Sequence, residues 1–205
     1  MRKRYKDVLS LIEKHKYIQT SMIAQELFRF PTGKVKAQQV LKRMTEEGII
    51  NRFRVGSRTD YIYYTGKRSQ KWWHWLELSR FHFTLLQELK QWQRIIYFET
   101  EVRYPFGIAD AFYIIKLTID GDGLMFFLEV DDGQNNFDKV IKYLNYYKGK
   151  SWRGEWWGKE GFPYVLVVTP RQDSIKYLIS KSEGAEEIFR VSPTHEGSLE
   201  TLKGA

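Results

Sequence analysis

The chain has 205 residues, no cysteine and a formal net charge of +8. The lack of cysteine excludes disulfide bonds, thiolate zinc sites and cysteine nucleophiles, and no apolar run reaches the length of a transmembrane helix. The 7 Trp, 13 Tyr and 13 Phe supply apolar surface for a sizeable core, so disorder is not expected. We therefore expect a soluble, cytoplasmic protein with no part in a membrane.

The positive charge is concentrated in the first third of the chain. Residues 1–70 carry 16 Lys and Arg against 6 Asp and Glu, whereas residues 71–205 carry 17 against 19. Such an asymmetry indicates that the basic part meets a polyanion such as nucleic acid.

Three helices are predicted in this basic part. Residues 4–16 and residues 22–28 each show apolar side chains at helical spacing. A third helix is predicted over residues 32–47 and is followed by Gly48, a residue type common just after a helix. The buried residues of the third helix are expected to be Val35, Val40, Leu41 and Met44.

Two short strands, residues 49–55 and 61–64, are predicted next, around a polar and basic turn. Three helices followed by a hairpin resemble the winged helix-turn-helix domain, over about residues 3–66, and we assign residues 1–66 to it. Such a domain lays its third helix in the major groove and its wing against the backbone or minor groove. The resemblance implies that double-stranded DNA is contacted by Lys34, Lys36, Gln38, Gln39, Lys42 and Arg43 of the third helix and by Arg52, Arg54 and Arg58 of the wing.

These side chains suit two kinds of contact. Gln38 and Gln39 could read base edges, since glutamine pairs bidentately with adenine. The lysines are better suited to phosphates, which position a protein without reading sequence. The alternative is a winged helix that serves only as a protein–protein module, with its lysines solvated.

A polar break at residues 67–71 marks the end of this domain, and residues 67–93 are assigned to a bridging helix. The predicted helix at residues 72–92 is apolar on too many faces for a helix with one wet side. It is therefore expected to pack between domains or against a partner chain, and a homodimer is the expected oligomer.

The remaining residues, 94–205, alternate between strands and helices. Asp-Gly pairs in residues 119–123 predict a hairpin turn, and residues 152–162 are predicted to be a loop. The fold class is α/β (α+β), with a mixed sheet in this second domain. The strands are predicted at residues 95–104, 108–117, 124–131, 164–169 and 187–191, and the helices at residues 135–147 and 173–180.

Four carboxylates lie near the ends of two neighbouring predicted strands: Asp110 on one, and Glu129, Asp131 and Asp132 on the next. Adjacent strands are about 4.8 Å apart, so carboxylates on one face can share a divalent cation. Residues two apart on a strand face the same way. We therefore predict a Mg²⁺ or Mn²⁺ site at Asp110, Glu129 and Asp131. Without a cation the acids would repel one another, unless Lys139 or Lys142 of the following helix neutralises them.

The strand order with these acids is similar to the PD-(D/E)xK nuclease fold, in which an Asp and a Glu hold Mg²⁺ and a Lys two residues later helps to activate water. Asp110 and Glu129 match the two acids, but Asp131 stands where the lysine would be. The resemblance implies a catalytic set of Asp110, Glu129 and Asp131, with Glu101 or Glu99 as a further acid. It equally allows a degenerate nuclease domain that only serves as a scaffold and needs no cofactor.

Nearly the whole chain resembles the replication-relaxation family of plasmid and mobile-element proteins. The matching segments are Asp110-Ala111, Phe127-Leu-Glu-Val-Asp131 and Tyr143-Leu-Asn-Tyr-Tyr147. The resemblance implies a DNA-binding accessory protein in plasmid replication and DNA relaxation, working with a replication initiator or a relaxase. The alternatives are a Mg²⁺-dependent DNA endonuclease or nickase, and a transcription regulator of a mobile element.

Overall fold

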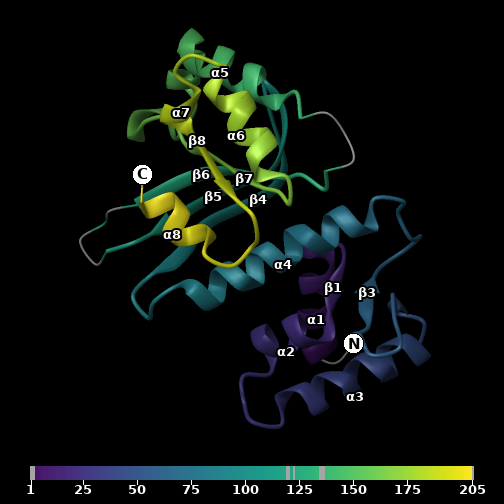
Figure 1. Ribbon diagram of the computed structural model, residues 1–205. Coiled ribbons are helices and arrows are strands. Elements are labelled where there is room, and N and C mark those ends of the chain that lie inside the picture. Colours follow the sequence, from purple (N-terminus) through teal and green to yellow (C-terminus); the bar gives the residue numbers. More distant parts are fainter. Residues whose placement is uncertain (1–2, 119–120, 122, 134–136, 205) are drawn as a thin grey trace. The chain divides into compact units, whose positions relative to one another are not determined.

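The computed structural model describes residues 3–118, 121, 123–133 and 137–204 (Figure 1). The chain forms two compact units, Met1–Phe83 and Thr84–Ala205, and the boundary between them falls within the residues of α4 (Trp72–Glu88). The first unit holds a three-stranded sheet and the second a five-stranded mixed sheet, so the protein is mixed α/β as expected. In the described part of the chain, none of the helices is both long and apolar enough to cross a bilayer.

The first unit contains a small antiparallel sheet of strand order β1-β3-β2, whose first strand lies between the first and second helices. The predicted helices and both predicted strands are present, with shorter strands. Residues 17–19, between the first two predicted helices, contain a further strand in which Ile18 pairs with Tyr63. The elements are α1 (Lys3–His15), β1 (Ile18–Gln19), α2 (Thr20–Leu27), α3 (Gly33–Glu46), β2 (Asn51–Phe53) and β3 (Ile62–Tyr64).

The phase of α3 differs from the prediction. Its inner face consists of Gly33, Ala37, Leu41 and Met44, which recur at helical spacing. Val35 was expected in the core, but it lies on the opposite side and is 56% exposed, so this prediction was wrong. A Cβ at Gly33 would lie 1.8 Å from the carbonyl oxygen of Phe28. The close approach that this glycine allows fixes which side of α3 faces inward.

The first part of α4, up to Phe83, belongs to the first unit. The Ser79 hydroxyl donates a hydrogen bond of 2.6 Å to the carbonyl oxygen of Tyr17, just before β1. The rings of His15 in α1 and His82 in α4 are 4.8 Å apart and both are buried. Residues 67–93 were predicted to form a bridging helix. The helix in this segment ends at Glu88, and its first part supplies core residues to the first unit.

In the second unit, β4, β5 and β6 are antiparallel, whereas β6, β7 and β8 are parallel, in the order β4-β5-β6-β7-β8. Two 3-10 turns, η1 (Ser151–Gly154) and η2 (Gly158–Glu160), interrupt the predicted loop. The other elements are β4 (Arg94–Tyr104), β5 (Gly107–Lys116), β6 (Gly123–Val130), α5 (Lys139–Gly149), β7 (Tyr164–Val168), α6 (Gln172–Ser180), α7 (Ala185–Ile188), β8 (Phe189–Ser192) and α8 (Ser198–Lys203).

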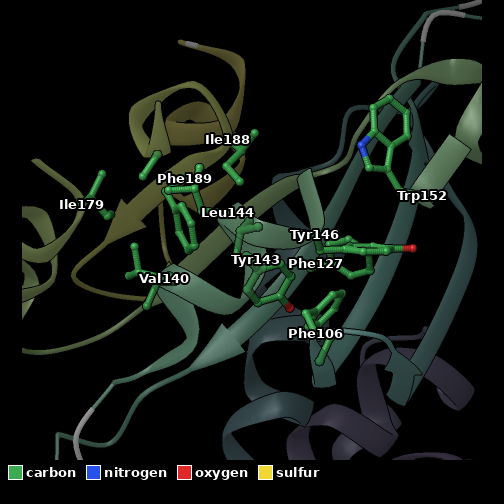
Figure 2. Packing of buried hydrophobic residues seen from close by; sticks show 14 of the residues in the cluster. Phe106, Phe127, Val140, Tyr143, Leu144, Tyr146, Trp152, Ile179, Ile188 and Phe189 are labelled. Carbon is green, nitrogen blue, oxygen red and sulfur yellow. The ribbon is translucent and has the colours of Figure 1, made fainter. Parts of the chain in front are cut away.

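The helices α5 and α6 connect the parallel strands and lie together on one side of the sheet (Figure 1), as crossovers of one hand require. Between them and the sheet lies an aromatic core (Figure 2). The Tyr143 ring of α5 lies 4.0 Å from Phe106 and 5.5 Å from Phe127, measured between centroids. The alternate residues Phe126 and Leu128 point to the other face and are buried too. Burial on both faces explains why these strands are continuously apolar.

Several boundaries differ from the predictions. The predicted start of one helix at Asn135 lies outside the described residues, as do parts of the predicted turn at 119–123; the described helix begins at Lys139. A helical turn, α7, replaces the start of the last predicted strand, and α8 was not predicted. Both helices are short, and short helices carry a weak periodic signal.

Candidate functional site

The polar residues of α3 form one exposed surface. Because the inner face of α3 is fixed by Gly33, Ala37, Leu41 and Met44, the intervening residues turn outward. All six polar residues predicted to contact DNA are exposed: Lys34, Lys36, Gln38, Gln39, Lys42 and Arg43.

The lysines of α3 differ in their partners. Lys34 lies 3.3 Å from Asp60, and Lys42 lies 3.7 Å from Glu46. For Lys36 and Arg43, no ion pair occurs among the residues that the structure describes. These two side chains are therefore the cations of α3 that are most available to an anionic partner.

The β2–β3 hairpin adds three arginines, Arg52 in β2 and Arg54 and Arg58 in the loop that follows it. The guanidinium groups of Arg52 and Arg54 lie 4.1 Å and 3.7 Å from the Tyr61 ring centroid, a cation–π arrangement, and Arg58 is exposed. Asp60 of this loop accepts the Ser21 backbone N–H at 3.0 Å and pairs with Lys34. The start of α3 and the β2–β3 loop are thus joined, and the nine residues predicted on α3 and the β2–β3 hairpin make up what we call the basic surface.

In the second unit, Asp110 and Glu129 come together across β5 and β6. The strands pair Ala111 with Leu128, so the next residue on each, Asp110 and Glu129, lie opposite one another on the same face. Asp110 Oδ2 accepts the Val130 backbone N–H at 2.8 Å. The structure therefore places these two acids together.

A lysine from α5 completes this group. Lys139 Nζ donates to Glu129 Oε2 and lies 3.7 Å from Asp110 Oδ1. The Tyr143 hydroxyl, one helical turn further along α5, donates to Glu129 Oε1 at 2.6 Å. We call Asp110, Glu129, Lys139 and Tyr143 the acid–lysine cluster. Of the two lysines proposed from sequence, Lys142 instead pairs with Asp138 at the surface.

Burial dominates the electrostatics of the acid–lysine cluster. Glu129 is 1% exposed, and burial followed by the nearby charge of Asp110 raises its pKa to about 8. Burial acts to lower the pKa of Lys139, but the charges of Glu129 and Asp110 outweigh it and leave this pKa raised. The Lys139 ammonium group is thus retained as the counter-charge of Asp110, and of Glu129 above about pH 8, where that group is ionised.

Asp131 has a different environment. The strand β6 ends at Val130, and the Asp131 carboxylate accepts two hydrogen bonds of 2.8 Å from Arg171 and one of 2.7 Å from the Thr169 hydroxyl. Burial acts to raise the pKa of Asp131, but these hydrogen bonds outweigh it and lower the pKa. Asp131 is thus paired with Arg171, a pair that no pattern in the sequence indicates.

The remaining predicted acids are exposed. Asp132 and Glu101 both lie at the surface, and Glu101 has a positive φ of 54° in β4. Glu99 is also exposed and accepts a hydrogen bond from Tyr97. In residues 3–118, 121, 123–133 and 137–204, no three His, Cys, Asp or Glu side chains gather closely enough to hold a metal ion.

The acid–lysine cluster does not fit a divalent cation as it stands. Both oxygens of Glu129 are engaged, by Tyr143 and by Lys139, and one oxygen of Asp110 is engaged by a backbone N–H. A metal ion would have to displace the Lys139 ammonium, which already supplies a positive charge at this position.

Comparisons with family models, with curated proteins and with solved structures found no match for this chain. The function is therefore argued from the basic surface and the acid–lysine cluster. In the sequence, Tyr143 stands in an aromatic run, and that pattern does not indicate its contact with Glu129. Its position four residues after Lys139, on the same side of one helix, was the available signal.

Proposed function

We propose that this chain binds double-stranded DNA through its first unit. In this proposal the first unit is a winged helix-turn-helix domain, with α3 in the major groove and the β2–β3 loop as the wing. The observation that carries it is that the polar residues of α3 are exposed on one side while Lys34 and Asp60 join that helix to an arginine-rich loop. Lys and Arg side chains at such positions neutralise phosphates and release counterions.

The second unit is proposed to be a PD-(D/E)xK-like domain that acts as a scaffold. Glu129 is enclosed and its oxygens are engaged by Tyr143 and Lys139, which supports a structural role for the acids. The resemblance to the replication-relaxation family supports an accessory role at a plasmid origin or nick site. The partner protein in that role would be a replication initiator or a relaxase.

DNA binding can be tested by fluorescence anisotropy of a labelled duplex over a series of salt concentrations. We expect affinity to fall steeply with salt, and the double variant Lys36→Ala/Arg43→Ala to reduce the slope of log affinity against log salt by about 2, since each lost phosphate contact removes about 1. The matched control, Lys176→Ala/Lys181→Ala, removes two exposed cations from the second unit and should leave the slope unchanged. Equal losses in both variants would contradict the proposed surface.

A second candidate function is a Mg²⁺- or Mn²⁺-dependent DNA endonuclease or nickase. One observation favours it: Lys139 brings to Asp110 and Glu129 the residue type that the sequence lacks at Asp131. Nicking of supercoiled plasmid with either ion, compared between the natural chain, Asp110→Asn and the exposed-acid control Asp138→Asn, separates the candidates. The scaffold proposal expects no nicking by any of the three. Nicking that is lost only in Asp110→Asn would contradict the scaffold proposal and support the endonuclease.

A further inference from the structure

Val35 is an apolar side chain that folding leaves in solvent, 56% exposed at the centre of the outer face of α3. Successive residues of a helix are rotated by about 100°. Measured from the inner face of Gly33, Ala37, Leu41 and Met44, Val35 therefore points almost directly away from the core. Gln38, Gln39 and Lys42 follow it by three, four and seven residues and lie on the same outer side.

A single exposed apolar residue is ordinary on a protein surface. Val35 differs because the other exposed residues of α3 between Lys34 and Arg43 are all polar or charged. Two of them, Lys36 and Arg43, are the cations without an ion pair in the described residues. An apolar group at the centre of such a surface fits a ligand that is anionic at its edges and apolar at one point inside.

Thymine in duplex DNA provides such a point. Its 5-methyl group projects into the major groove, where it is contacted by apolar side chains, and an adjacent adenine offers the two groups that glutamine recognises. We infer that Val35 contacts the 5-methyl group of a thymine in the bound duplex, within a site whose centre contains A·T pairs. This inference rests on the proposed function and specifies the DNA that it would recognise.

Replacing thymine by deoxyuridine tests this contact, because it removes the methyl group and leaves the hydrogen-bonding groups in place. A preferred duplex would first be selected from a randomised library with the full chain, and each thymine would then be replaced singly. At one thymine we expect the affinity of the natural chain to fall about fourfold, the value of one buried carbon group. Val35→Ala should bind the thymine duplex more weakly by a similar factor and should not respond to deoxyuridine at that position.

The matched control is Val55→Ala. Val55 is the same residue type, is 59% exposed and lies in the β2–β3 loop, so its variant should keep the full response to deoxyuridine at the thymine that Val35 contacts. Thermal unfolding of both variants should match that of the natural chain, since neither side chain is in the core.

The possible results separate this inference from the proposed function. Salt-dependent duplex binding with no response to deoxyuridine at any position overturns the role of Val35 and leaves the DNA-binding proposal standing. A response that persists unchanged in Val35→Ala also overturns that role. If the chain binds no duplex at all, both the inference and the proposed function fail.

Discussion

The Tyr143 hydroxyl donates a hydrogen bond of 2.6 Å to Glu129 Oε1, and both side chains are enclosed in the second unit. A buried carboxylate without donors is strongly unfavourable. Tyr143 serves one oxygen and Lys139 the other, so the stability of this unit should depend on both donors.

The first prediction concerns Tyr143→Phe, which removes only the hydroxyl group. In urea at about pH 9, where Glu129 with its pKa of about 8 is ionised, we expect the free energy of unfolding to fall by about 2 kcal/mol, within the range for hydrogen bonds to charged groups. Tyr146→Phe is the control on the same helix, because its hydroxyl donates to Glu155 over 3.3 Å and should contribute less. Equal losses in the two variants would show that the hydrogen bond to Glu129 contributes no more to stability than the one to Glu155.

The second prediction concerns Lys139→Met, which leaves Glu129 enclosed without its counter-charge. At about pH 9, above the pKa of about 8 that Glu129 has beside Lys139, we expect a loss of about 3 kcal/mol in the free energy of unfolding, because the buried carboxylate must then stay charged without a partner or bind a proton. Adding Glu129→Gln to this variant should recover part of the loss. The control, Lys142→Met, breaks an exposed pair with Asp138 and should cost at most about 1 kcal/mol. A cost for Lys139→Met no larger than that of the control would contradict the prediction.

The third prediction concerns Asp131, whose carboxylate is held by Arg171 and Thr169. Since its pKa is lowered by folding, its contribution to stability is present above the unfolded pKa and is lost as the pH falls through the lower, folded pKa. Asp131→Asn should therefore destabilise the protein near neutral pH by about 1–3 kcal/mol and have a smaller effect in acid. A difference from the natural chain that grows on acidification would contradict this account.

The fourth prediction concerns the buried histidine pair of the first unit. Burial followed by the charge of Lys14 lowers the pKa of His15 to about 3; burial, His15 and Lys14 lower the pKa of His82. The unfolded chain binds these protons first, so stability should fall as the pH drops below the unfolded value of about 6.5 toward the folded value.

Between about pH 7 and about pH 5, His15 alone should cost roughly 2 kcal/mol of stability. Chemical unfolding of the natural chain and of His15→Gln at these two pH values measures this share, since the variant lacks the titrating group. If the free energy of unfolding depends on pH to the same extent in both proteins, His15 is not the cause of that dependence.

The sequence by itself determined the order of the larger helices and strands. Helical spacing gave α1, α2 and α3, alternating and continuous apolar runs gave the large strands, and both patterns arise from burial of whole faces. The pairing of Asp110 with Glu129 also followed from sequence, because two acids at matching ends of adjacent strands meet wherever the strands pair.

Only the tertiary structure decided which side chains end beside one another. The phase of α3, set by the close approach of Gly33 to Phe28, turned Val35 outward. Because β6 ends at Val130, Asp131 pairs with Arg171, a residue 40 positions away. Lys139, and not Asp131, lies beside Asp110 and Glu129. Local periodicity cannot give these outcomes, because they depend on distances between segments that are remote in the chain.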